Sequence, residues 1–227
     1  MSRDALTPGV TTLIGMYDSS YTRRVAVTLA LLGLPFEHRA WSVGRDFDRI
    51  RAYNPLGRAP TLVLGDGEVL TESAMMLDYI DQLAGAERAL LPATGASRRQ
   101  AQLLVALATG AIDKAVLIVL ERIFRPEAMR SAVFLARCRS QVHGALAELE
   151  RHCAARAGHD WLVGDTMTQA DISVTCFATH LREAVPWDFA PYPALRAHVE
   201  RCEALPVFRG FYLPFDAPVP TAQAEPA

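Results

Sequence analysis

The 227-residue chain lacks an excess of charge of either sign. Its 23 Lys and Arg residues nearly balance its 25 Asp and Glu residues, which gives a formal net charge of −2 at pH 7. The basic residues are dispersed along the chain instead of forming long runs, so the charge pattern of a nucleic-acid-binding protein is missing. We therefore expect no nucleic acid among its partners.

Cysteine is scarce, and its spacing indicates neither disulfides nor metal binding. Cys138, Cys153, Cys176 and Cys202 lie at least 15 residues apart, with no CxxC pair and no histidine cluster at the spacing of zinc ligands. The first residues also lack the apolar segment of a secretion signal, which disfavours a disulfide-stabilised secreted fold. We expect free structural thiols, no metal site and a cytoplasmic location.

No apolar run is both long enough and free enough of charged residues to predict a membrane span. The longest, residues 103–120, contains Asp113 and Lys114 near its middle, and two charges there would be costly in lipid. At helical spacing, Asp113, Lys114, Glu121 and Arg122 are expected to pair along the helix, although they could instead serve a subunit interface. With 51% hydrophobic residues, the chain can bury a substantial core, so we expect a buried helix and no membrane partner.

The residue pattern that is present changes once, near residue 85. Before this point, predicted strands cover residues 11–16, 36–41, 61–64 and 68–71, and predicted helices cover residues 20–32, 46–53 and 72–83. The Gly65-Asp66-Gly67 triplet predicts a tight hairpin between the last two strands, because Asp-Gly accepts the positive φ values of such turns. The pattern is therefore a small βαβ-α-ββ-α domain.

After residue 85 the strand signals disappear and an all-helical domain is expected. Predicted helices cover residues 97–124, 126–156, 168–183, 192–204 and 207–212, with Pro126 in the first turn of the second helix. We divide the chain into a domain of residues 10–84, a linker of residues 85–96, a helical domain of residues 97–215 and a flexible tail of residues 216–227. The tail is rich in proline and small residues.

The turn between the first predicted strand and the first predicted helix could hold an anion. Residues 16–25 read Met-Tyr-Asp-Ser-Ser-Tyr-Thr-Arg-Arg-Val. Backbone N–H groups at a helix start carry the positive end of the helix dipole, so a thiolate, phosphate or carboxylate would be stabilised there. Ser19 could add a hydrogen bond. Ser19 and Ser20 are also ordinary N-cap residues, so a plain capping role stays open.

Further local features have both a functional and a structural interpretation. Pro60 precedes the third predicted strand, and a cis bond there would present the backbone of Ala59 to a ligand, although a plain strand start is equally compatible. Glu72 and Ser73 open the third helix, where they could simply cap it. Residues 168–171, Thr-Gln-Ala-Asp, are similar to a capping box, and we interpret them as structural.

Taken in order, these motifs resemble a cytosolic glutathione transferase. They are the Ser-bearing first turn, Asn-Pro-x-Gly-Arg-x-Pro-Thr-Leu at residues 54–62, Glu-Ser at the third helix, and Thr-x-Ala-Asp-Ile at residues 168–172. The resemblance covers roughly residues 11–212. It implies an α/β domain of the thioredoxin-like fold, followed by an all-α helical bundle, and a homodimer. The first turn is most similar to that of bacterial serine-type members.

The resemblance implies glutathione as a cosubstrate, without any bound cofactor. Ser19 would donate a hydrogen bond to the glutathione sulfur and so favour the thiolate, which is the nucleophile. The thiolate would then attack an electrophilic, mostly apolar second substrate, which is a detoxification reaction.

The resemblance also implies how glutathione would be bound. The backbone of Ala59 would pair with its cysteinyl part beside a cis Pro60, and Glu72 and Ser73 would bind its γ-glutamyl end. The guanidinium of Arg58 suits the glycyl carboxylate, although Arg58 could also be a solvated loop charge.

Alternatives remain open at the first turn and in the reaction. Ser20 stands where many relatives carry proline, and Tyr17 is a further candidate for the sulfur contact. The absence of cysteine from the turn argues against thiol-transferase activity. The same turn resembles that of the zeta branch, with Tyr21 in place of its cysteine, which suggests isomerisation of maleylacetoacetate as an alternative. A non-catalytic binding protein with this fold is the other alternative, because a fold alone does not confer activity.

Overall fold

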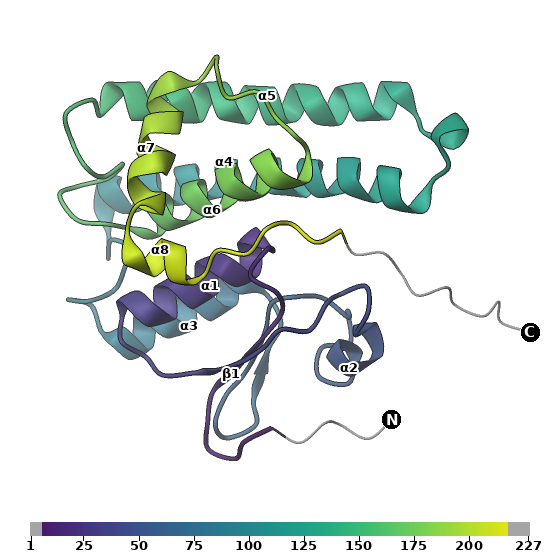
Figure 1. The fold of residues 1–227 in the computed structure, drawn as a ribbon. Helices are drawn as coiled ribbons and strands as arrows, with labels where there is room; N and C mark the ends of the chain where they lie inside the picture. The colour runs from purple at the N-terminus through teal and green to yellow at the C-terminus, as the bar shows by residue number, and fades with distance from the viewer. Residues whose placement is uncertain (1–5, 218–227) are drawn as a thin grey trace, which may run out of the picture.

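The computed structural model describes residues 6–217 and shows a small sheet domain beside a larger helical domain (Figure 1). The first domain contains β1 (Thr12–Ile14), α1 (Ser20–Leu31), β2 (Glu37–Arg39), α2 (Phe47–Arg51), β3 (Thr61–Val63), β4 (Val69–Leu70) and α3 (Ser73–Ala84). The second contains α4 (Gly95–Phe124), a 3₁₀ turn (Glu127–Met129), α5 (Ala132–Ala155), α6 (Gln169–Ala184), α7 (Pro193–Glu203) and α8 (Pro206–Gly210). Most of the tail predicted to be flexible, residues 218–227, lies outside the described residues.

The sheet has the strand order β2-β1-β3-β4. Strand β1 is parallel to β2 and antiparallel to β3, with Leu13 paired to His38 on one side and to Leu62 on the other. Strands β3 and β4 are antiparallel, and Gly67 in their connection has φ +92°. These pairings confirm the predicted βαβ unit and the predicted hairpin.

Side chains alternate across the sheet, and each face has its own core. Leu13 and Leu62 pack with residues of α1 and α3, among them Val25 and Ile80. The next residue in each of the two strands, Ile14 and Val63, packs on the opposite face with Trp41, Ile50 and Tyr53. Because successive strand residues point to opposite faces, short strands of consecutive apolar residues can build both layers.

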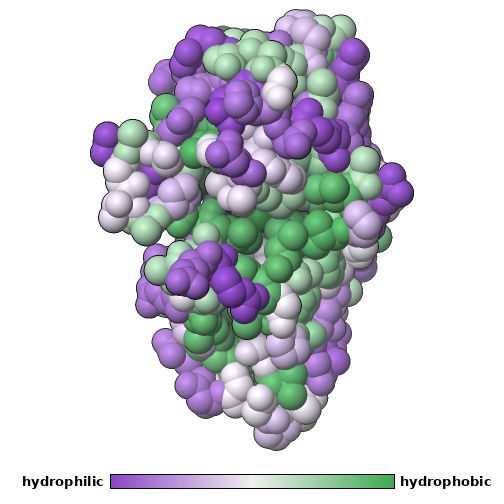
Figure 2. Space-filling view, turned by 90° about the vertical axis from the view of Figure 1, so that its left-hand side faces the viewer, coloured by the Kyte–Doolittle hydropathy of each residue, from purple (hydrophilic) through white to green (hydrophobic). Residues whose placement is uncertain are grey.

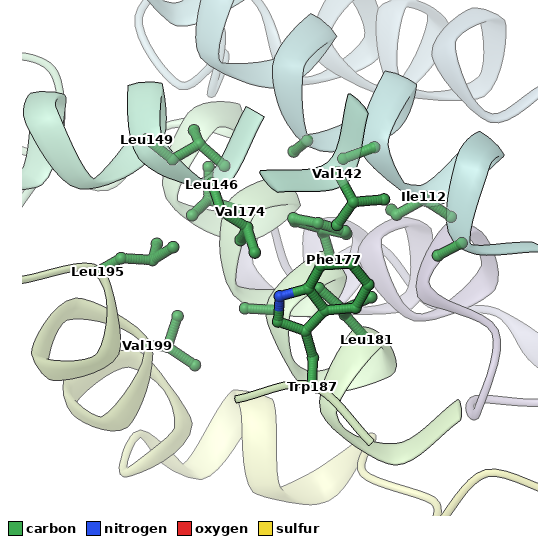
Figure 3. Packing of buried hydrophobic residues seen from close by; sticks show 14 of the residues in the cluster. Ile112, Val142, Leu146, Leu149, Val174, Phe177, Leu181, Trp187, Leu195 and Val199 are labelled. Carbon is green, nitrogen blue, oxygen red and sulfur yellow. The ribbon is translucent and has the colours of Figure 1, made fainter. Parts of the chain in front are cut away.

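The helical domain is built around α4, α5 and α6. Its largest core cluster includes Ile112 of α4, Leu146 of α5 and Phe177 of α6, which point toward one another in Figure 3. Helix α4 is long and apolar enough, by length and composition, to cross a membrane. Its buried residues instead pack against the other core helices, which confirms the predicted buried helix.

Two helix starts differ from the prediction by more than one residue. Pro126 is not in the first turn of α5: it has φ −53° and ψ 146° and precedes the 3₁₀ turn, and α5 begins only at Ala132. The reason is local, because Ser131 has extended backbone angles and its side chain accepts a hydrogen bond from the Phe134 N–H. Helix α4 begins at Gly95, two residues before the predicted start at Ser97.

The domains meet along α1. Val27 of α1 packs with Ile172 and Cys176 of α6, and with Phe208 of α8. The guanidinium of Arg23 donates two bonds of 2.7 Å to the Glu203 carboxylate and one of 2.8 Å to the Phe208 carbonyl oxygen. Figure 2 shows hydrophobic residues gathered at the height of this junction on one side of the molecule. Helix α1, and the turn before it, are therefore fixed relative to both domains.

Candidate functional site

Three predicted site segments meet at one edge of the sheet. Ile14, the last residue of β1, is paired with Thr61, the first residue of β3, and Leu70, the last residue of β4, is paired with Leu62. The turn after β1, the loop before β3 and the start of α3 therefore share this edge. Contact here is close: a Cβ on Gly15, which has φ +133°, would lie 2.8 Å from the Ala59 Cβ.

Ser19 is the N-cap residue of α1. Its extended backbone angles, φ −72° and ψ 117°, are those of a residue just outside a helix, and its Oγ accepts from the Thr22 N–H at 3.5 Å. This distance is long for a hydrogen bond, so the hydroxyl is only weakly engaged by the cap. Ser19 is half-buried and lines a cleft between the two domains.

The two rival residues of the turn do not line this cleft. Ser20 is 2% exposed and its Oγ faces the interior, without a hydrogen-bond partner among residues 6–217. The Tyr17 ring stacks on His38 with a centroid distance of 3.9 Å and meets Phe211 edge-on. Burial raises the pKa of Tyr17 to about 12, so its phenol is neutral near pH 7. Of the three candidates, Ser19 is the one exposed to the cleft.

The cleft has a polar end and an apolar wall, with a volume of about 230 Å³. Ser19, Arg58 and Ala59 form part of the polar end. The apolar wall comes from α4, from the loop after β2 and from the C-terminal segment, through Val116, Val119, Leu120, Val43 and Phe215. A site of this kind suits a ligand with one polar and one apolar part.

The loop before β3 presents its backbone to the cleft. The Ala59–Pro60 peptide bond is cis, which confirms the prediction for Pro60. The Arg58 carbonyl oxygen accepts from Asn54 Nδ2 at 3.2 Å and from Thr61 Oγ1 at 2.9 Å, which fixes the loop. The Arg58 guanidinium is exposed at the cleft.

Glu72 and Ser73 lie at the same sheet edge but do not line the cleft. The Glu72 carboxylate caps α3 by accepting from the Ala74 N–H at 2.6 Å, and it also accepts from Ser73 Oγ at 3.1 Å. Ser73 is buried, and its Oγ accepts from Arg24 at 2.7 Å. The capping interpretation of Glu72 is therefore realised, and the exposed carboxylate still borders the shared edge.

Arg24 is a residue of this site to which the sequence analysis assigned no role. It is 2% exposed and links α1 to Ser73 of α3 and, at 3.4 Å, to Ser173 of α6. Burial lowers the pKa of Arg24, and the nearby Glu72 carboxylate opposes this effect. Arg24 thus connects the start of α3 with the helical domain.

Tyr21 is a second residue that the sequence analysis missed as a cleft residue. Its hydroxyl donates to the Asp113 carboxylate at 2.6 Å, and the Thr109 carbonyl oxygen lies 3.2 Å away. Asp113 was expected to pair along its own helix, and this expectation is wrong, because its partner comes from α1 of the other domain. Tyr21 and the α4 wall are held together across the cleft.

Comparison with known proteins identifies the family. A family model described as "Glutathione S-transferase, N-terminal domain" matches residues 13–88, and one described as "Glutathione S-transferase, C-terminal domain" matches residues 132–201. A crystal structure of a glutathione S-transferase from Methylobacterium radiotolerans, in complex with glutathione sulfonate, has a TM-score of 0.81 and 33% identity over 96% of this chain and 98% of that one. The chain belongs to the glutathione S-transferase family.

Other relatives of this chain carry different names. An uncharacterized GST-like protein, YibF, from Escherichia coli is 29% identical over 74% of this chain and 81% of its own length. A maleylpyruvate isomerase from Ralstonia is 27% identical over 87% of this chain and 94% of its own length. The family and its two-domain fold are therefore established, which confirms the expected fold class of a thioredoxin-like domain followed by a helical bundle.

Proposed function

We propose that this protein is a glutathione transferase of the serine type, which activates the glutathione thiolate at Ser19. The observation that carries the proposal is the position of Ser19: it caps α1, lines the interdomain cleft and lies beside Ala59 and an apolar wall. Ser20 and Tyr17, which lie in the same turn, face other parts of the molecule. A sulfur placed in this cleft could receive a hydrogen bond from the hydroxyl of Ser19.

The groups of this turn can supply the free energy that is needed to stabilise a thiolate. Each unit by which a thiol pKa falls requires about 1.4 kcal/mol of preferential stabilisation of the thiolate. One charge-assisted hydrogen bond from Ser19, together with the positive end of the α1 dipole, can supply one to two such units. Ser19 Oγ accepts from the Thr22 N–H, a bond that does not use the hydroxyl proton, so this proton is available to the sulfur.

Glutathione would lie along the shared sheet edge. We propose that its cysteinyl backbone pairs with Ala59, next to Pro60, and that its γ-glutamyl end reaches Glu72 and Ser73. Arg58 would bind the glycyl carboxylate, for which its exposed, planar guanidinium is suited. The glutathione sulfonate bound to the Methylobacterium relative supports a tripeptide ligand for this fold.

The second substrate would be apolar and without negative charge. Arg58, assigned to glutathione, is the one permanently cationic side chain among the described residues that line the cleft. Asp18 and Asp216 also line it, and Asp216 is already paired with Arg45 at 2.8 Å. These carboxylates would repel a dianionic substrate, and the apolar wall would favour a hydrophobic electrophile.

Isomerisation is the second candidate reaction, and the Ralstonia relative named maleylpyruvate isomerase favours it. In such a reaction, the thiolate adds to a conjugated double bond, which permits rotation before glutathione leaves. Isomerase substrates of this type, maleylacetoacetate included, carry two carboxylates, for which the cleft offers few cations. A non-catalytic glutathione-binding protein is the third candidate.

Membership of the family also suggests the location, the oligomeric state and the partners of the protein. We propose that the protein works as a cytoplasmic homodimer in detoxification, with glutathione as cosubstrate and no resident cofactor, and that neither nucleic acid nor a membrane is a partner. Large exposed apolar side chains, such as Leu56, which is 63% exposed, and Met75, which is 50% exposed, support a subunit interface.

The Ser19→Ala substitution tests the proposed function. We expect wild-type protein to bind glutathione and to lower its thiol pKa, measured through thiolate absorbance as a function of pH. Ser19→Ala should raise that pKa by about 1–2 units and lower kcat/KM about 10- to 100-fold, with glutathione affinity nearly kept. The matched controls, Ser20→Ala and Tyr17→Phe, should behave as wild type. An unshifted thiol pKa in wild type would refute thiolate activation.

A substrate panel separates the three candidate functions. Neutral apolar electrophiles, peroxides, maleylacetoacetate and maleylpyruvate should be offered with glutathione to the same preparation. We expect the neutral electrophiles to give the highest kcat/KM. Preferential turnover of the dicarboxylates would assign the isomerase, and glutathione binding without turnover of any compound would assign the binding protein.

A further inference from the structure

His180 of the helical domain reaches across the domain junction to the turn that carries Ser19. It lies on α6 and is 8% exposed, and its Nδ1 is 2.9 Å from the Asp18 carbonyl oxygen. A carbonyl oxygen can only accept, so Nδ1 carries the proton and donates. The Asp18 carbonyl belongs to the peptide group that joins Asp18 to Ser19.

The other imidazole nitrogen of His180 is buried and lacks a partner among the described residues. With Nδ1 protonated, Nε2 of the neutral ring is a bare acceptor. Burial lowers the pKa of His180, and the Asp18 contacts only oppose this, so the neutral form is kept near pH 7. The ring and Ser20, whose hydroxyl is also unpaired, line one small interior space of about 10 Å³.

His180 also contacts the other side of the cleft. Its ring meets the Phe215 ring edge-on, with a centroid distance of 5.4 Å and an interplanar angle of 88°. The next residue, Asp216, donates its backbone N–H to the Asp18 carboxylate at 3.0 Å. His180, Phe215 and Asp216 all line the cleft. The imidazole therefore lies between the Ser19 turn and the apolar wall.

We propose that His180 is a positioning residue, which holds the Asp18–Ser19 peptide through its Nδ1–H and so directs the Ser19 hydroxyl toward the glutathione sulfur. This inference rests on the proposed role of Ser19. Rotation of that peptide group would displace Ser19 from the helix cap, and displacements of about 1 Å lower rates substantially when a hydrogen bond must be aligned. The helical domain thereby takes part in thiol activation through a residue of α6.

A pair of amide substitutions tests which nitrogen of the imidazole matters. The side-chain N–H of Asn lies near the Nδ1 position, and that of Gln near Nε2, so His180→Asn can keep the bond to Asp18 and His180→Gln cannot. We expect His180→Gln to raise the thiol pKa of bound glutathione by about one unit and to lower kcat about tenfold at neutral pH, with KM for glutathione nearly unchanged. His180→Asn should remain within about threefold of wild type in kcat, which is less than about half a pKa unit.

The control is His198→Asn, which removes another buried imidazole, 2% exposed, from α7 away from the cleft. It should leave the thiol pKa unchanged even where it lowers stability. Equal thiol pKa values in wild type and His180→Gln would overturn the inference, as would loss of activation in His180→Asn with retention in His180→Gln. A wild-type protein that leaves the glutathione thiol pKa unshifted would instead refute the proposed function itself.

Nitrogen-15 NMR of histidine in the wild-type protein gives a test without substitution, should the variants fail to fold. The His180 ring should show the Nδ1–H tautomer, and its signals should shift when glutathione saturates the protein. Observation of the Nε2–H tautomer would overturn the inference. Ring signals of His180 that do not shift at saturating glutathione would also overturn it.

Discussion

Two neighbouring arginines at the start of α1 form hydrogen bonds with different parts of the molecule. Arg23 pairs with the Glu203 carboxylate and joins α1 to the end of the helical domain. Arg24 donates to the Ser73 and Ser173 hydroxyls, so it joins the start of α3 to α6. Both are 2% exposed; the Glu203 carboxylate compensates the charge of Arg23, and the nearby Glu72 carboxylate favours the charged form of Arg24. One helical turn thus holds three parts of the molecule around the site.

Arg24→Lys is expected to weaken both the fold and the binding of glutathione. A lysine keeps the charge, but it is a point charge that cannot reach both serines, so about 2 kcal/mol of unfolding free energy should be lost. Because Ser73 would lose its donor Arg24 and keep only its bond to Glu72, the dissociation constant for glutathione should rise severalfold in calorimetric titration. Arg151→Lys, on the exposed surface of α5, is the control and should change neither quantity. Unchanged glutathione affinity in Arg24→Lys would remove Ser73 from the proposed site.

At the scale of one element, helix α6 has the most fully bonded start. Thr168 accepts from the Ala170 N–H at 3.2 Å, and the Asp171 carboxylate accepts from the Thr168 N–H at 2.8 Å, which completes a capping box. The same carboxylate also accepts from the Leu162 N–H at 2.8 Å. This helix carries His180 and Ser173, so its start fixes residues that reach the site.

Asp171→Ala should be strongly destabilising. The carboxylate is fully buried and accepts several hydrogen bonds, so its removal leaves buried N–H groups unsatisfied and should cost about 3 kcal/mol of unfolding free energy. Chemical denaturation followed by circular dichroism measures this. Asp165→Ala, an exposed aspartate in the preceding loop, should leave the denaturation midpoint unchanged. A loss in Asp171→Ala no larger than in this control would contradict the assigned capping role.

The start of helix α5 is an element boundary that the local sequence pattern predicted wrongly. Proline is common in first helical turns, and Pro126 therefore predicted a start that the chain does not use. Ser131 has the same kind of signal and is the cap that forms, with the 3₁₀ turn in between. A proline suited to a first turn and a serine suited to an N-cap stand five residues apart here, and sequence pattern alone does not rank two such signals.

At the scale of the whole molecule, acid should destabilise the fold through His198. Burial, with a smaller contribution from Arg201, lowers the pKa of His198 from its ordinary value of 6.5 to about 4. Between these values the unfolded chain binds more protons than the folded one, so stability is complete above pH 6.5 and falls as the pH falls toward 4. The slope is at most about 1.4 kcal/mol per pH unit for this one residue.

The measurement is the unfolding free energy at several pH values between 7 and 5. In His198→Asn, which cannot titrate in this range, the decline should be shallower than in wild type. His159→Asn, at an exposed histidine, should keep the wild-type slope. Parallel slopes in wild type and His198→Asn would show that other groups cause the acid sensitivity.

The proposed homodimer is the second prediction for the whole molecule. Sedimentation should give twice the mass of the chain, because Leu56, Met75 and Leu103 expose large apolar side chains that a partner subunit would cover. Leu56→Asp should shift the equilibrium toward monomer, whereas Leu31→Asp, at the end of α1, should not. A monomer at all concentrations in wild type would exclude the proposed assembly.

The sequence by itself determined the parts that depend on neighbours along the chain. The alternation of strand and helix patterns, the Asp-Gly hairpin and the capping box at Thr168 each rest on residues a few positions apart, and the structure reproduces all of them. Local sterics and backbone hydrogen bonding suffice for such features.

Only the tertiary structure decided which side chains face the cleft. Ser19 and Ser20 are adjacent and chemically identical, and packing of α1 against α6 turns one toward the cleft and the other toward the interior. The bonds from Tyr21 to Asp113 and from His180 to Asp18 join residues 92 and 162 positions apart. No spacing rule predicts such pairs, because they arise from the docking of two separately patterned domains, which brings these side chains within hydrogen-bonding distance.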